Sequence, residues 1–378
     1  MIHNRSADGL RGIAAISVVF SHFCCAYLPF LMHGFYPDTF HEIHHPDFWY
    51  YCTQQPFLSV FYSGHFAVAI FFVLSGYVLA MPYYLQQPEK ITRRLWGRYL
   101  RLNLPIAVTI LISYLLFSGH LYFYLPASEI SHSSWLHDSM LASTVNFSSM
   151  ISCAVYAAIT LGRQPYNPPL WTIQVEFVGS LILLAYYAVK PRGRDGLTFA
   201  FVAVLLWAVC PDSCVYYISI FFGSYINKWK PSQKLLISSL LLGIYFGGFA
   251  YDNALYRFLP DFSLQDQKTF YDTVGAALVV LAVVNGAGAK IFQHPTIQYF
   301  GRISYAVYLL HFLVLCSLSC WLYSVLPPTV GSLIGNFAVY FAVVIFLAHY
   351  FEKQVDRRAI LVSHKFGDFL FRGTRMAA

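Results

Sequence analysis

The sequence predicts an all-α membrane protein, a polytopic bundle of about ten transmembrane helices with both termini in the cytoplasm. Three observations lead to this fold class. Hydrophobic residues make up 58% of the 378 residues. Charged residues make up only 11%, whereas a soluble protein has about 25%. The apolar residues also occur in long runs, and about 20 consecutive apolar residues suffice for a helix to cross a hydrocarbon core about 30 Å thick.

Ten stretches are apolar enough to form helices in a membrane. The segment 135–161 is also apolar, but it contains Asp138, Asn146 and many serines, so we expect an interfacial or re-entrant segment there. The stretches 197–211 and 214–228 are short, and we expect a tight helical hairpin. The ten predicted spans are 10–30, 64–84, 104–124, 170–189, 197–211, 214–228, 235–251, 273–290, 303–325 and 331–351.

The distribution of lysine and arginine predicts the orientation, because these residues accumulate in cytoplasmic loops. With the N-terminus inside, 21 of the 24 basic residues fall in cytoplasmic segments, and the exceptions are Arg163, Arg257 and Lys268. A full span at 135–161 would invert every later segment and remove this asymmetry. We therefore expect one transmembrane domain over 1–378, with extracytoplasmic loops at 31–62 and 125–169 and a cytoplasmic tail at 352–378.

Composition also bears on other classes of protein. The net charge of +7 does not indicate nucleic-acid binding, because the basic residues follow membrane topology.

The eight cysteines show no disulfide framework, and most are expected to be small buried residues of the spans. Four histidines in the 31–62 loop (His33, His41, His44 and His45) are of a type that binds metal ions. A polar, aromatic-rich loop that caps the bundle is the favoured interpretation, and no metal is expected.

Three titratable residues lie within predicted spans, where a charge is costly and therefore indicates function. His22 lies about 18 Å along its helix from Leu10, and Glu176 lies about 9 Å below the outer boundary, so the two share a level in the membrane. A carboxylate that orients an imidazole creates a general base, and we predict such a pair. A structural pair that joins two helices is the alternative. His311 lies about 12 Å above the cytoplasmic face, where a hydrogen-bonded core residue is the favoured interpretation.

The basic segment from Lys90 to Arg101 is a candidate phosphate site. Arg94, Arg98 and Arg101 fall on one helical face by their spacing, and clustered guanidinium groups bind phosphates. Topology and contact with anionic lipids give an alternative explanation. In the second predicted span, Ser75 is interpreted as a packing residue at a helix crossing rather than as a nucleophile.

Five motifs occur in order from about residue 5 to residue 350. They are Asp8-Gly-Leu-Arg11-Gly-Ile-Ala-Ala leading to His22, Phe71-Phe72-Val-Leu-Ser75-Gly76, Arg98-Tyr-Leu-Arg101-Leu-Asn-Leu-Pro105, Asn167-Pro-Pro-Leu-Trp171-Thr-Ile-Gln-Val-Glu176 and Ser304-Tyr305-Ala-Val-Tyr308-Leu-Leu-His311. In the first motif, ten residues separate an arginine from a histidine. Together, the five motifs resemble those of the acyltransferase 3 family of integral membrane O-acyltransferases.

The resemblance implies transfer of an acyl group, often acetyl, from cytoplasmic acyl-CoA to a hydroxyl group, commonly of a carbohydrate. It implies that His22 is the general base and that Glu176 orients His22 or contacts the acceptor. A route through an acyl-histidine stays open. The CoA phosphates would be held by Arg11, Arg94, Arg98 and Arg101. The remaining motif residues would bind substrate, and they are Asp8, Ser75, Asn167, Trp171, Tyr305, Tyr308 and His311.

The expected partners are acyl-CoA, a hydroxylated small molecule or glycan, and the lipids of a plasma membrane or endomembrane. Two other classes stay open. A proton-coupled transporter would use the buried His22 and Glu176, although paired broken helices in two matching halves are not evident in the sequence. A structural or lipid-scaffolding protein would tolerate glutamine or asparagine in place of His22.

Overall fold

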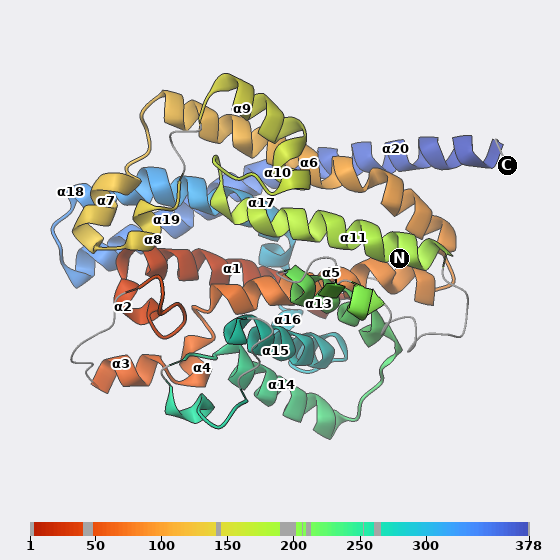
Figure 1. Cartoon of the computed structure of the whole chain (residues 1–378), viewed down its shortest axis with the longest axis horizontal. Helices are drawn as coiled ribbons and strands as arrows, with labels where there is room; N and C mark the ends of the chain where they lie inside the picture. The colour runs from red at the N-terminus through yellow and green to blue at the C-terminus, as the bar shows by residue number, and fades with distance from the viewer. Residues whose placement is uncertain are drawn as a thin grey trace.

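The computed structural model describes residues 4–40, 48–140, 145–189, 202–205, 207–208, 213–251, 253–260 and 266–376, and every regular element within these ranges is helical (Figure 1). The all-α fold class is therefore confirmed. Both chain ends lie at the right of Figure 1, whereas the short helices α2 (Pro29–Met32), α3 (Phe48–Thr53), α7 (Tyr124–Ser131) and α8 (Ser134–His137) lie at the left.

Among the described residues, seven helical stretches are long and apolar enough to cross a membrane. This finding confirms an integral membrane protein. The stretches contain α1 (Arg5–Tyr27), α5 (Gly64–Tyr84), α6 (Pro88–Ser118), η3 (Pro168–Leu170) with α11 (Trp171–Val189), α15 (Gln267–Val284), α17 (Pro295–Val314) with η7 (Leu315–Ser319) and α18 (Cys320–Val325), and α19 (Val330–Phe351) with η8 (Glu352–Asp356) and α20 (Arg357–Met376).

The other predicted spans correspond to shorter helices or fall largely outside the described residues. Helices α13 (Cys214–Tyr225) and α14 (Gln233–Gly247) occupy two of them, and most of 197–211 lies outside the described residues, as do His41, His44 and His45. The count of ten spans and the cytoplasmic termini therefore stay predictions. The remaining short elements are α4 (Pro56–Ser59), α9 (Phe147–Ser152), η2 (Cys153–Ala157), α10 (Ala158–Leu161), η5 (Ile226–Lys228), η6 (Ala254–Tyr256) and α16 (Ala289–Phe292).

The helix predicted to span 104–124 begins earlier, at Pro88, and so includes the basic segment 90–101. This segment forms the first part of α6, which begins at Pro88, a residue favoured at the first helical position. No further proline occurs before Pro105, which the helix accommodates. Helix α20 packs along this part of α6, where the backbone of Ser363 approaches Gly97 closely. The arginines of α6 are therefore held on a rigid, two-helix support.

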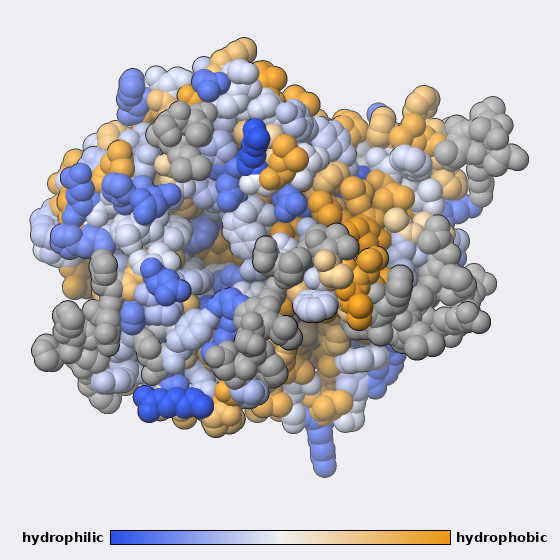
Figure 2. Space-filling view, in the orientation of Figure 1, coloured by the Kyte–Doolittle hydropathy of each residue, from blue (hydrophilic) through white to orange (hydrophobic). Residues whose placement is uncertain are grey.

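The surface carries many exposed apolar side chains, as expected for helices that face lipid. On α14, Leu241 is 52% exposed, and on α19, Ile334 and Phe346 are 65% and 60% exposed. Figure 2 shows apolar side chains (orange) gathered over the right half of one face, around α11. Soluble proteins rarely expose contiguous apolar patches of this kind, so the surface agrees with membrane embedding.

Helices α5 and α13 cross at a pair of glycines. A Cβ atom on Gly76 would overlap the carbonyl oxygen of Ile220, and a Cβ atom on Gly223 would overlap the carbonyl oxygen of Val73. Small residues permit such close backbone approach between membrane helices. The crossing fixes the part of α5 that carries Ser75, as the small residues at this position predict.

We expect Gly76→Ala to lower the stability of the protein by about 1–3 kcal/mol, because the added methyl group forces α5 and α13 apart. The measurement is the thermal midpoint of the protein in detergent. Gly335→Ala is a matched control, since a Cβ atom at Gly335 meets nothing within 4 Å. Equal midpoints for the two variants would contradict the close packing of α5 on α13.

Candidate active site

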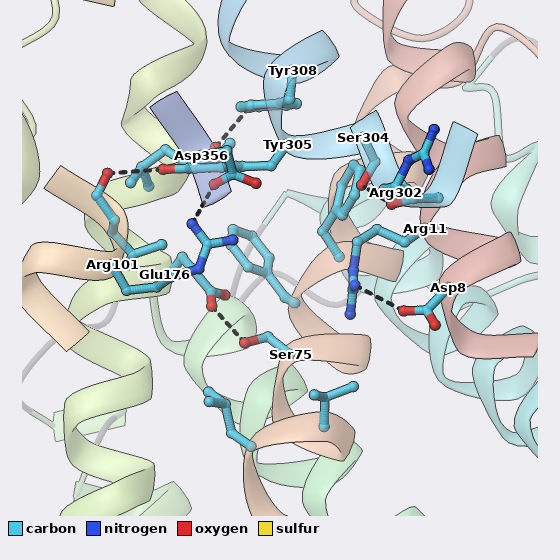
Figure 3. Close-up of a pocket in the computed structure, with 18 of the residues that line it drawn as sticks. Asp8, Arg11, Ser75, Arg101, Glu176, Arg302, Ser304, Tyr305, Tyr308 and Asp356 are labelled. Atoms are coloured by element: carbon cyan, nitrogen blue, oxygen red, sulfur yellow. Dashed lines mark hydrogen bonds and ion pairs between the residues drawn. The ribbon is translucent and has the colours of Figure 1, made fainter. Parts of the chain in front are cut away.

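A large cavity, called here the arginine cavity, lies between α1, α5, α6, α11, α17 and the η8–α20 segment (Figure 3). Its volume is about 610 Å³. Four arginines from three helices line it, and four carboxylates accompany them. The arginines are Arg11, Arg98, Arg101 and Arg302, and the carboxylates belong to Asp8, Glu176, Glu352 and Asp356. Each guanidinium group has five N–H donors, so one carboxylate partner leaves other donors for a ligand.

Arg98 of α6 forms an ion pair and a hydrogen bond with α11. Arg98 donates from Nη2 to Oε1 of Glu176 and from Nε to Oγ of Ser180, the latter at 2.7 Å. Oγ of Ser75 also donates to Oε1 of Glu176, at 2.5 Å. The Arg98 and Glu176 side chains are only 12% and 16% exposed. Glu176 therefore fixes the Arg98 guanidinium, and Ser75 is a hydrogen-bond donor to Glu176 rather than a packing residue alone.

Arg101 of α6 forms an ion pair with the η8 segment. Arg101 Nη1 lies 2.6 Å from Oδ1 of Asp356, and its guanidinium carbon lies 5.1 Å from the ring centre of Tyr305. The Tyr305 hydroxyl donates to the Leu102 carbonyl at 3.0 Å. An ion pair and an aromatic face thus hold this cation at the cavity wall.

The remaining arginines differ in their surroundings. Arg11 Nη1 lies 3.2 Å from Oδ1 of Asp8, and the guanidinium carbon of Arg302 lies 5.2 Å from the ring centre of Tyr299. Arg94, which its helical spacing placed with the predicted phosphate site, is not part of the cavity wall. Its guanidinium donates to the Val78 carbonyl at 2.9 Å, so it joins α6 to α5.

A second, smaller cavity, called here the histidine cavity, adjoins the first. Its volume is about 290 Å³, and His22 and His65 both line it. Val68 and Tyr308 line both cavities, so these two residues mark the boundary between them. The histidine cavity is also lined by residues of the 31–62 and 125–169 loops, namely Tyr36, Trp135 and Gln164. The arginine cavity contains residues near both chain termini, and the histidine cavity lies beneath the loops at the other end of the bundle.

His22 pairs with His311, not with Glu176. Nδ1 of His22 lies 2.8 Å from Nε2 of His311, and Nδ1 of His311 lies 2.8 Å from the carbonyl oxygen of Tyr308. A carbonyl only accepts, so Nδ1 of a neutral His311 carries the proton and its Nε2 accepts from His22. Nδ1 of His22 then donates, which leaves Nε2 of His22 unprotonated. The hydrogen-bond partner of His22 is thus His311, whereas the sequence predicted Glu176.

The other predicted substrate residues lie in or near the walls of the two cavities. Tyr308 donates its hydroxyl hydrogen to the Pro169 carbonyl at 2.9 Å. Asn167 is fully buried and donates to the Leu309 carbonyl at 2.9 Å, so its side-chain amide joins the start of η3 to α17. Trp171 lines the histidine cavity and lies 5.4 Å, between ring centres, from Tyr216. Asp8, Ser75 and Tyr305 line the arginine cavity instead.

Sequence reasoning missed His65 and its partners. Nδ1 of His65 lies 3.1 Å from Oδ2 of Asp272, and Nζ of Lys268 lies 3.1 Å from the same carboxylate oxygen. Nε2 of His65 faces the Tyr216 hydroxyl at 2.8 Å. Lys268 was one of the three basic residues that fell outside the predicted cytoplasmic segments. Its burial beside Asp272 explains that exception. The four-residue spacing of this pair was the available signal.

Arg302 and Asp356 were also not predicted as site residues. The sequence analysis counts Arg302 among the cytoplasmic basic residues, and Asp356 falls in the predicted cytoplasmic tail. Only the packing of α17 and η8 beside α6 brings them to the cavity. Among the described residues, no three histidine, cysteine, aspartate or glutamate side chains gather closely enough to hold a metal ion.

Comparison with known proteins gives a family. A family described as "Acyltransferase domain" matches residues 4–351 of the chain. The chain is also similar to the O-acetyltransferase PaAT-1 of Phomopsis amygdali, with 25% identity over an alignment 391 positions long that spans 82% of this chain and 72% of the relative. No solved structure matches the chain at a significant level.

Proposed function

The chain belongs to the acyltransferase family whose domain spans residues 4–351, and on that premise we propose that this membrane enzyme moves an acyl group from acyl-CoA to a hydroxyl group. Acetyl is the proposed acyl group, and a carbohydrate or another hydroxylated molecule is the proposed acceptor. One observation carries the proposal: an oriented histidine base and an arginine-lined cavity adjoin at Val68 and Tyr308.

The arginine cavity is the proposed donor site. Arg11, Arg98, Arg101 and Arg302 come from three helices and line the same cavity, and Figure 3 labels three of them, Arg11, Arg101 and Arg302. Guanidinium groups bind phosphate oxygens through paired hydrogen bonds, and CoA carries several phosphate groups at one end of a long, flexible arm. With its phosphates on the arginines, the arm would pass Val68 and Tyr308 and bring the thioester to His22.

His22 is the proposed general base in a direct transfer. Nε2 of His22 takes the proton from the acceptor hydroxyl while the oxygen attacks the thioester carbonyl carbon. A carbon–oxygen bond forms, the carbon–sulfur bond breaks, and the proton passes from His22 to the departing CoA sulfur. His311 keeps His22 in the required tautomer by accepting from its Nδ1, as a fixed partner does in other histidine bases.

Glu176 is proposed to be a positioning residue of the donor site, since it holds Arg98 and accepts from Ser75. Asp8 positions Arg11 in the same way, and Tyr305 holds Arg101. Tyr308 is proposed to contact both substrates, because it lines both cavities. Trp171 is proposed to contact the acceptor alone, because it lines only the histidine cavity.

The proposal is tested with purified protein in detergent, given acetyl-CoA and no membrane gradient. We expect slow release of free CoA thiol, which a thiol reagent detects, and faster release when an acceptor is present. A transporter would not consume the thioester. Failure to bind acetyl-CoA and failure to release thiol would together overturn the proposed donor.

A further test addresses the tautomer of His22. We expect His311→Leu to lower kcat by about 10²-fold, because His22 loses the acceptor that orients it. His311→Gln should retain much more activity, since the amide oxygen of the introduced glutamine can accept from Nδ1 of His22. The KM for acetyl-CoA should change little in either variant. Equal losses in the leucine and glutamine variants would contradict an orienting hydrogen bond.

A further inference from the structure

The histidine cavity differs from the arginine cavity in charge. Apart from its two histidines, every described side chain in its wall is aromatic, aliphatic or uncharged and polar. The nearest ion pair, Asp272 with Lys268, lies behind His65, and these two residues are 0% and 1% exposed. That pair is already neutralised within the protein. A charged ligand group would therefore lose its water in this cavity without gaining an opposite charge, which is strongly unfavourable.

The walls of the histidine cavity are mainly aromatic and aliphatic. Five aromatic side chains contribute to them, and between them lie short uncharged groups such as Ser21. Aromatic faces bind the apolar C–H faces of rings, and a few polar groups fix a ligand's orientation. The volume of about 290 Å³ is suited to one small ring system. The aromatic residues are Tyr36, Trp135, Trp171, Tyr308 and Phe312.

One polar group in this wall has no partner among the described residues. Oε1 of Gln164 is buried and accepts no hydrogen bond, although Gln164 lines the cavity. A buried acceptor without a donor is destabilising, and such groups are rare in folded proteins. A hydroxyl group of a ligand in the cavity would supply the missing donor, while another hydroxyl of the same ligand faces His22.

We propose that the histidine cavity binds the acceptor, that this acceptor is an uncharged, ring-shaped molecule with at least two hydroxyl groups, and that Gln164 binds a hydroxyl other than the one that reacts. The inference rests on the proposed acyl transfer and names its substrate class. A neutral sugar ring or an alicyclic diol fits this description. Phosphorylated, carboxylated and amino-bearing acceptors do not.

The experiment uses the full-length protein and acetyl-CoA with a labelled acetyl group. A metabolite extract from cells that make the protein is separated by ion exchange into neutral, acidic and basic fractions, and each is offered as acceptor. We expect label in the neutral fraction only. Gln164→Leu should lower transfer at low acceptor concentration by about 3- to 10-fold, as for one lost hydrogen bond.

Gln174→Leu is the matched control, because it makes the same chemical change on α11 at a residue that does not line the cavity. Thermal midpoints in detergent verify that both variants are folded. Label transferred into the acidic or basic fraction would overturn the inference, and so would equal transfer by Gln164→Leu and Gln174→Leu. Loss of thioester turnover in wild-type protein would instead overturn the proposed function, so the two failures are distinguishable.

Discussion

Replacing His22 with alanine should lower the rate of acyl transfer by about 10²–10⁴-fold, which is the usual contribution of a positioned general base. Binding of acetyl-CoA should be retained, because the four arginines of the proposed donor site line the adjoining cavity and not the cavity of His22. The measurement combines release of CoA thiol with equilibrium binding of acetyl-CoA to protein in detergent. A large loss of kcat with an unchanged dissociation constant would assign His22 to the chemical step.

The control for this variant is His364→Ala, which removes an exposed histidine of α20 that lines neither cavity. It should behave like wild-type protein in both assays. Full transfer activity in the His22→Ala variant would exclude His22 as the base. The same result would leave the donor site intact and would direct attention to His65, the other histidine in the cavity wall.

The sequence predicted the fold class, the membrane location and most helices, because long apolar runs leave few other structures in a bilayer. It also identified His22 and His311, since each is a titratable residue inside a span. It did not pair them. The predicted span for His311 began at residue 303, whereas α17 begins at Pro295. Measured from Pro295, His311 lies about 24 Å along α17, and His22 lies about 26 Å along α1 from Arg5.

These helices start at the same level, because the Gln298 side chain donates to the Arg5 carbonyl. The two histidines therefore meet. The depth of His311 in the membrane was predicted wrongly because the start of α17 was placed at residue 303 instead of Pro295.

The predicted pairing of Glu176 with His22 failed for a different reason. Depth along a helix can be estimated from the number of residues, but hydropathy contains no information on which helices are neighbours or how each is rotated. Helix α11 packs against α5 and α6, and it directs Glu176 to Arg98 and Ser75. Arg302 and Asp356 were missed for the same reason, because their position at the donor site depends only on tertiary packing.

Arg98→Met should lower the free energy of unfolding by about 3–5 kcal/mol, because it leaves the Glu176 carboxylate buried without its cation. Ser75 remains as a hydrogen-bond donor to Glu176, but a neutral hydroxyl does not offset a buried charge. The double variant Arg98→Met/Glu176→Gln should recover most of this stability, since a neutral pair of similar size replaces the ion pair. Denaturation of the protein in detergent measures both changes.

Binding of acetyl-CoA should not recover with stability. If the Arg98 guanidinium binds a phosphate group, its loss weakens binding by about 10- to 100-fold in the single and double variants alike, as for a hydrogen bond to a charged group. Arg93→Met is the control, because Arg93 is 43% exposed and pairs with Asp368 at the surface, where such pairs contribute at most about 1 kcal/mol. If the double variant bound acetyl-CoA as tightly as wild-type protein, Arg98 and Glu176 would join α6 to α11 only, and the donor phosphates would be held by Arg11, Arg101 and Arg302. The comparison thus separates the two roles that one buried arginine combines, support of the helix packing and binding of the donor.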